Sequence, residues 1–171
     1  MNEHAKAEDG ATLSRRGSEG SRRHDDLRDR PGYLVRRLHQ IHVGLFAEEF
    51  ADCKLTPVQY AMLSILSART GIDQLSLSKA VGVDRTSGAD VIKRLVREKL
   101  VMRTTSPDDR RMKLVSITPA GADLACQMRP AMDAAQDRLM SPLSPDEREA
   151  FMDTLHRMIE ANNGASRAPM S

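Results

Sequence analysis

Apolar residues recur at helical spacing over most of the chain after residue 31. In the first such stretch, four of them follow the i, i+4, i+7, i+11 pattern of one buried face: Leu34, Leu38, Ile41 and Leu45. A capping residue followed by proline marks three later helix starts, at Thr56–Pro57, Thr118–Pro119 and Ser144–Pro145. These signals and the stretches between them predict six helices, over about 32–52, 57–68, 76–81, 84–99, 119–140 and 145–162.

The pattern changes between the fourth and fifth helices. Gly82 ends a short helix, and Asp84 opens the next one as its predicted N-cap. Two predicted strands follow, over 100–105 and 112–117, with a charged hairpin at 106–111 between them. A helix–turn–helix followed by a basic hairpin is a shape that reads duplex DNA, with the second helix in the major groove and the hairpin at the flanking minor groove or backbone. The predicted fold class is mainly α with a small β wing: a winged helix-turn-helix domain plus long N- and C-terminal dimerisation helices.

Positive charge is concentrated on this predicted reading unit. The net charge of the whole chain is only +2, but residues 79–113 hold ten Lys or Arg against five acids. Residues 119–163 hold four Arg against eight acids. Binding to DNA phosphates releases counterions, so a basic reading unit beside an acidic remainder favours double-stranded DNA as the partner.

The domain organisation follows from composition. Residues 1–30 are rich in Gly, Ser, Arg and Asp, carry few large apolar residues, and are predicted to be a disordered N-terminal extension. Its Arg15, Arg16, Arg22 and Arg23 either touch DNA phosphates or belong to a solvated, dispensable tail. The predicted domain spans 31–162, with the DNA-binding lobe at 55–118, dimerisation helices at 31–54 and 119–162, and a flexible tail at 163–171.

The first, fifth and sixth predicted helices carry more apolar surface than the small central unit could cover. Burial against a second copy is the simplest solution, so a two-fold homodimer is predicted. A dimer also matches paired DNA half-sites about one helical turn, roughly 10 bp, apart.

Other function classes lack support in the sequence. No apolar run approaches the roughly 18 residues that span a bilayer, so no membrane partner is expected and the cytoplasm is the expected location. The two cysteines, Cys53 and Cys126, are far apart and suggest no disulfide framework. There is no nucleophile elbow, phosphate loop, dinucleotide fingerprint or zinc-ligand set, so neither enzymatic activity nor a cofactor is expected.

Three segments of the chain resemble the multiple-antibiotic-resistance-regulator (MarR) family of winged-helix transcription factors. LTPVQYAMLSIL at 55–66 is similar to the second helix of that family, and LSLSKAVGVDRTSGADVIKRLVREKLV at 75–101 to its helix–turn–helix. SPDDRRMKLVSITPAG at 106–121 is similar to its wing and to the entry of the fifth helix. The resemblance covers about residues 31–162.

This resemblance implies an α-helical dimer with two winged lobes, usually a repressor. It also implies release from DNA by a small, frequently aromatic, acid bound between the helical dimer region and each DNA-binding lobe. Asp90 departs from the family, because many relatives have Arg or another non-acidic residue there. An acid at this position either accepts from cytosine N4 or orients Arg94, so base preference cannot be copied from relatives.

The predicted DNA contacts lie on the second helix of the motif and on the hairpin. Arg85 suits guanine, Thr86 and Ser87 suit base edges or phosphates, and Gly88 and Ala89 leave room for close approach. In the hairpin, Asp109 is expected to hold an arginine extended through a charge-assisted hydrogen bond. The full predicted set is Arg85, Thr86, Ser87, Asp90, Lys93, Arg94, Asp109, Arg110 and Arg111.

The predicted effector site is centred on the first helix. Aromatic rings for stacking stand near imidazole and guanidinium groups suited to a carboxylate. The set is Tyr33, Arg36, Arg37, His39, His42, Phe46 and Tyr60. The alternatives for His39 and His42 are hydrogen-bonded positions in the core or dimer interface, or a metal site, which lacks an Asp, Glu or Cys ligand at a helpful spacing.

Two other readings of the same fold stay open. One is a protein-interaction adaptor that does not bind DNA, which the basic residues of 85–113 argue against. The other is a redox-responsive regulator, in which a cysteine of low pKa senses oxidants. Neither Cys53 nor Cys126 has the expected electropositive surroundings, since Glu48, Glu49 and Asp52 lie near Cys53.

Overall fold

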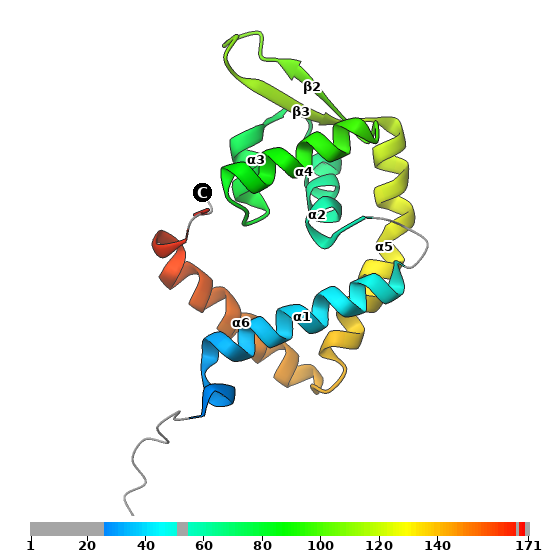
Figure 1. Cartoon of the computed structure of the whole chain (residues 1–171). Helices are drawn as coiled ribbons and strands as arrows, with labels where there is room; N and C mark the ends of the chain where they lie inside the picture. The colour runs from blue at the N-terminus through cyan, green and yellow to red at the C-terminus, as the bar shows by residue number, and fades with distance from the viewer. Residues whose placement is uncertain (1–25, 51–54, 167, 170–171) are drawn as a thin grey trace, which may run out of the picture.

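A computed structural model of the chain describes residues 26–50, 55–166 and 168–169, and it is mainly helical with one small sheet (Figure 1). The helical base contains α1 (Pro31–Glu49), α5 (Pro119–Met140) and α6 (Pro145–Asn162). The lobe that the sequence predicts to bind DNA, called the DNA-binding lobe below, contains α2 (Pro57–Ala68), β1 (Ile72–Asp73), α3 (Gln74–Ala80), α4 (Arg85–Arg97), β2 (Val101–Thr105) and β3 (Lys113–Ile117). Short 3-10 helices flank α1 and α6, at Leu27–Asp29 and Asn163–Ala165.

Capping residues start α2, α5 and α6 where the sequence predicts. The Thr56 side chain accepts a hydrogen bond from the Gln59 backbone N–H, and the Gln59 side chain accepts one from the Thr56 N–H, which completes a capping box at α2. Ser144 and Glu147 form the same reciprocal pair at α6. Thr118 caps α5, so all three predicted capping-residue and proline starts are confirmed.

The sheet has three antiparallel strands in the order β1-β3-β2. Val101 pairs with Ile117, and the ladder runs to Thr105 opposite Lys113. Strand β1 was not predicted, because its two residues are too few for a strand pattern. Helix α3 begins at Gln74, earlier than the predicted start at Ser76, because Asp73 at the end of β1 is its N-cap.

Two apolar clusters stabilise the chain. The larger fills the DNA-binding lobe, with Met62, Leu63, Leu77, Ile92 and Val115 fully buried. The smaller joins α1 to α2 through Phe46, Phe50 and Tyr60, with Met128, Ala131 and Met132 of α5 against it. The Phe46 and Phe50 rings stack at 3.9 Å between centroids.

Within one chain, α1 buries a face other than the leucine and isoleucine face that the sequence predicts to be buried. Leu34 and Ile41 are 52% and 47% exposed, and Leu38 and Leu45 are half-buried, whereas Phe46 is 1% exposed. Within one chain α1 therefore packs through the aromatic face that carries Phe46 and leaves its leucine and isoleucine face open. The predicted face is thus open in one chain, and its burial against a second copy stays a prediction. The i, i+4 spacing did not show that Phe46 belongs to another apolar face, which is buried within the chain.

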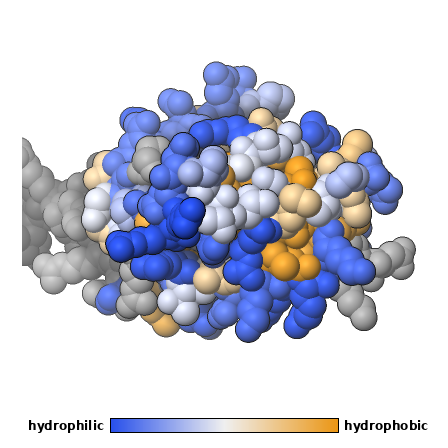
Figure 2. All heavy atoms as spheres, turned by 90° about the horizontal axis from the view of Figure 1, so that it is seen from above, coloured by the Kyte–Doolittle hydropathy of each residue, from blue (hydrophilic) through white to orange (hydrophobic). Residues whose placement is uncertain are grey.

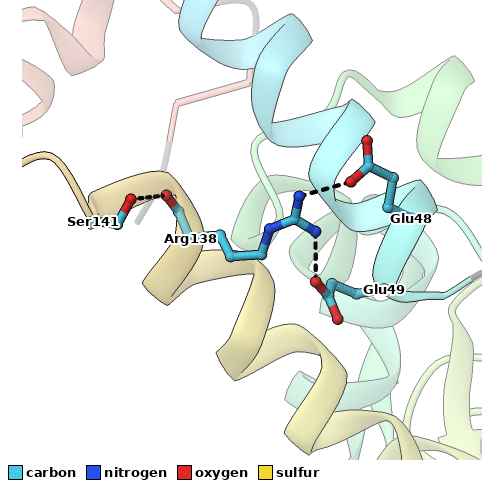
Figure 3. Close-up of polar contacts among 4 residues, drawn as sticks. All are labelled: Glu48, Glu49, Arg138 and Ser141. Atoms are coloured by element: carbon cyan, nitrogen blue, oxygen red, sulfur yellow. Dashed lines mark hydrogen bonds and ion pairs between the residues drawn. The ribbon is translucent and has the colours of Figure 1, made fainter.

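An arginine also links α1 to α5 near the end of α1. The two guanidinium nitrogens of Arg138 donate to Glu49 at 2.6 Å and to Glu48 at 2.7 Å (Figure 3). The hydrogen bonds to Glu49 and then Glu48 raise the pKa of Arg138. This forked contact fixes the end of α1 on α5, immediately before the chain passes to the DNA-binding lobe.

Candidate nucleic-acid interface

The helix–turn–helix is set by two aspartate caps and one glycine. Gly82 has φ +70°, a conformation that glycine adopts without strain, and it ends the turn after α3. The Asp84 carboxylate then accepts from the backbone N–H groups of Thr86 at 2.9 Å and Ser87 at 3.0 Å. The hydrogen bonds from Ser87, and after them the one from Thr86, lower the pKa of Asp84. Asp84 is thus the N-cap of α4, as the sequence predicts.

Close packing between α3 and α4 gives Gly88 a role other than the predicted one, which was to leave room for DNA. Gly88 is buried, and a Cβ atom at this position would overlap the Ser78 side chain, lying 2.5 Å from its Cβ. The Ser78 hydroxyl is tied to the Gln74 carbonyl at 2.7 Å. Gly88 therefore allows the two helices to cross closely and does not face DNA. Ala89, its neighbour in the prediction, is exposed.

The outer face of α4 carries the predicted DNA contacts. Ile92 and Leu95 are buried in the lobe, so residues between them on the helix turn outward. The Ser87 hydroxyl donates to Asp84 at 2.7 Å, so in this arrangement it has no proton left for a phosphate. The exposed residues of the predicted set on this helix are Arg85, Thr86, Ser87, Asp90, Lys93 and Arg94.

The wing turn is held by backbone contacts. Buried Ser106 accepts from the Asp108 and Asp109 N–H groups, and the Asp109 carboxylate accepts from the Arg111 backbone N–H at 2.8 Å. Among the described residues Asp109 forms no salt bridge, so the expected bond to a guanidinium is not made here; one of its carboxylate oxygens holds the turn through this backbone donor instead. Arg110 and Arg111 are exposed. Seen from above, this end of the molecule is mostly hydrophilic, with one apolar patch (Figure 2).

A cleft of about 380 Å³ separates the start of α4 from the wing. Its walls come from three segments that are distant in sequence: the start of α3, the first turns of α4 and the start of β3. The lining residues are Asp73, Gln74, Leu75, Arg85, Ala89, Arg111, Met112 and Lys113. Sequence reasoning singled out Arg85 and Arg111 but missed Leu75, Met112 and Lys113. The available signal for Lys113 was its place next to the predicted basic hairpin, since it is a cation that follows Arg111 by two residues.

The predicted effector residues divide into two groups. His42, Phe46 and Tyr60 lie together: the Phe46 ring is 6.5 Å from both His42 and Tyr60, edge-on in each case. Phe46 and Tyr60 are buried and His42 is half-buried. The other four predicted residues occupy the first half of α1, where Tyr33 is half-buried and Arg36, Arg37 and His39 are exposed.

His42 makes stability depend on pH. Burial lowers the pKa of His42, and the positive charge of nearby His39 lowers it further. The unfolded chain therefore binds a proton more readily at this site, so stability should fall as pH drops from about 8 to about 5.5, through the unfolded pKa near 6.5. We expect the loss of melting temperature over this range to be smaller in His42→Gln and intermediate in His39→Gln. Equal pH dependence in His42→Gln and the native chain would contradict this origin.

The described residues include no metal site and one free cysteine. Within the described ranges, no group of three His, Cys, Asp or Glu side chains is arranged to hold a metal ion. Cys126 is a free, exposed thiol on α5, and Cys53 lies outside the described residues. None of the described helices is long and apolar enough to cross a membrane.

Comparison with known proteins places this architecture in a family. Residues 55–113, which hold the lobe from α2 to the start of β3, match the MarR family. The transcriptional repressor NicR of Pseudomonas putida is 31% identical over 140 residues, which is 82% of this chain and 89% of NicR. The chain belongs to the MarR family. The resemblance inferred from the three sequence segments is confirmed, as is the winged-helix fold, and members of this family are transcriptional regulators rather than enzymes.

Solved structures of other MarR-type regulators have the same fold. BpsR of Bordetella bronchiseptica, whose DNA binding is regulated by 6-hydroxynicotinic acid, is 32% identical with a TM-score of 0.74, over 78% of this chain and 95% of BpsR. The repressor CouR, solved on a 23-mer DNA duplex, is 26% identical with a TM-score of 0.72, over 81% of this chain and 99% of CouR. A DNA-binding transcriptional regulator is thus supported by fold and by relatives together.

Proposed function

We propose that this MarR-family protein is a homodimeric, sequence-specific repressor that leaves a pseudopalindromic operator when a small aromatic or heteroaromatic acid binds. The observation that carries the DNA-binding part is the exposed cationic face of α4 and the wing. Among the described residues, the ion pairs of arginine involve Arg138 and Arg148, and none involves a cation of α4 or the wing. Those cations are available to phosphates and base edges.

The dimer is supported by α6 and by the open face of α1. An isolated helix of 18 residues is marginal in water, and helices in proteins are stabilised mainly by packing an apolar face. Yet α6 has no buried residue within one chain. Its Met152, Met158 and Ile159 are 45–49% exposed. Leu34 and Ile41 of α1 are exposed to a similar degree. A second copy that covers both helices is the occupant we propose, in keeping with the two-fold symmetry of most oligomers.

The effector proposal rests on the junction of α1, α2 and α5. There His42 borders the aromatic cluster, beside Met128 and Met132 of α5. His42 is half-buried, whereas Phe46 and Tyr60 are buried, so we expect an aromatic acid to enter from the side of His42, with its carboxylate towards the imidazole and its ring towards Tyr60. The regulation of BpsR by 6-hydroxynicotinic acid supports this chemical class.

The test is fluorescence anisotropy of the purified protein on DNA from upstream of its own gene, with and without a panel of aromatic acids. Tight binding that one acid reverses is expected, and His42→Ala should weaken that reversal without weakening binding in the acid's absence. Binding that no acid alters would remove the effector proposal and return His42 to a structural role. Binding to neither this DNA nor a random-sequence pool would favour the adaptor, whose partner binding would be insensitive to mutation of Arg85 and Arg111.

A further inference from the structure

The cleft between α4 and the wing combines cationic and apolar walls. Arg85, Arg111 and Lys113 line it from α4 and the wing, and Leu75 and Met112 line it from α3 and the wing. We propose that this cleft holds one sugar–phosphate unit of the DNA strand that separates the major groove from the minor groove. The proposal rests on the proposed DNA-binding function and assigns to it a defined backbone site.

Charge favours an anion in this cleft. Three cationic side chains line it against one acid, Asp73. The Asp73 carboxylate already accepts from the Leu75 and Ser76 backbone N–H groups, each at 3.0 Å, in its role as N-cap of α3. The amine of Lys113 donates a 2.7 Å hydrogen bond to the Thr105 hydroxyl on the neighbouring strand and retains two further protons to donate. A phosphate oxygen is the acceptor that such a group meets on DNA.

The apolar wall fits the sugar next to that phosphate. Leu75 is 45% exposed and Met112 is 42% exposed, so both apolar side chains are open to solvent in the cleft that they line. Deoxyribose presents C–H groups beside its phosphate, and covering them removes apolar surface of both partners from water. A free inorganic anion would use the cations alone and leave Leu75 and Met112 uncovered. The mixed lining therefore favours a nucleotide backbone unit over a simple ion.

The placement of the cleft agrees with the docking geometry. If α4 enters the major groove and the wing reaches the minor groove, the strand between these grooves must pass between α4 and the wing. The cleft lies at that crossing, between the first turns of α4 and the start of β3. Arg85 is then a backbone contact rather than the guanine reader expected from the sequence. Base discrimination moves to Thr86, Asp90 and the residues that follow them.

The experiment uses the duplex from upstream of the gene with single phosphates replaced, one at a time, by uncharged methylphosphonates. One replacement on the strand between the grooves should weaken the native protein roughly tenfold, as loss of a charge-assisted hydrogen bond does. The same replacement should have little further effect on Lys113→Gln, whereas a phosphate elsewhere in the site should weaken both proteins equally. Lys113→Arg should restore the native response, and an unchanged melting temperature in Lys113→Gln shows that the wing still folds.

Arg85→Gln and Leu75→Gln separate the backbone site from base reading. Both variants should lose affinity for the upstream duplex and for a scrambled duplex by the same factor. A loss confined to the upstream duplex in Arg85→Gln would overturn the assignment, as would additive effects of Lys113→Gln with every methylphosphonate. Native protein that bound neither duplex would instead contradict the proposed function itself.

Discussion

Ile41→Glu is expected to yield a monomer that has lost most of its affinity for DNA. Ile41 lies on the open apolar face of α1, and in a two-fold dimer each substitution places two carboxylates in the interface. Burying an unpaired charge costs several kcal/mol, so the dimer should weaken by roughly a hundredfold or more. A monomer engages one half-site and loses the avidity gain, which is about 10²–10⁴ for linked sites. Sedimentation and anisotropy on the same samples would measure both losses.

Gln40→Glu is the matched control for that variant. Gln40 is exposed and lies next to Ile41 in sequence, but it points away from the leucine and isoleucine face of α1. The Gln40→Glu variant introduces the same carboxylate and should remain a dimer with native affinity for DNA. A dimeric Ile41→Glu protein would show that the open face of α1 is not the interface.

Gly88→Ala is expected to reduce both stability and DNA affinity, although alanine is the better helix former. The new Cβ would overlap the Ser78 side chain, and overpacking of this kind costs about 1–3 kcal/mol. The helices can relieve the overlap only by moving apart, which displaces the DNA-contacting face of α4 relative to the wing. Thermal unfolding and anisotropy should show the two losses together.

Ser78→Gly offers a rescue of Gly88→Ala. The double variant removes the overlapping Cβ and hydroxyl, and the cost of glycine in α3, about 1 kcal/mol, is offset by the gain of alanine in α4. It should therefore recover DNA binding close to the native level. Gly32→Ala, at a position with open space around it, serves as the control and should leave DNA binding unchanged. Failure of the double variant to recover would place the damage outside the contact between α3 and α4.

Local signals explain why much of the fold could be predicted from the sequence. Thr56, Thr118 and Ser144 each satisfy backbone donors within their own first turn, so the start of the helix depends on neighbouring residues alone. The α1 faces could not be assigned in this way. Both Ile41 and Phe46 are apolar at helical spacing, and only the packing of α2 and α5 decides that Phe46 is buried within the chain.

The candidate site shows the same division. The basic residues of α4 and the wing were predicted because charge and motif lie in consecutive sequence. The roles of Gly88 and Asp109 were misassigned because they depend on contacts made in three dimensions: the side chain of Ser78 for one and the backbone of a tight turn for the other. The cleft could not be predicted because it depends on the pairing of β1 with β3, which brings the start of α3 next to the wing. That pairing has no signal in the sequence pattern.

The salt dependence of DNA binding in Arg111→Ala tests the central claim most directly. The variant loses one phosphate-contacting arginine from each half of the proposed dimer. It should therefore bind all sequences more weakly alike, and the slope of log affinity against log salt should fall by about two units, roughly one per contact. Arg129→Ala, an exposed arginine of α5 outside the proposed DNA face, should keep the native slope. An unchanged slope in Arg111→Ala would contradict the wing as a DNA contact.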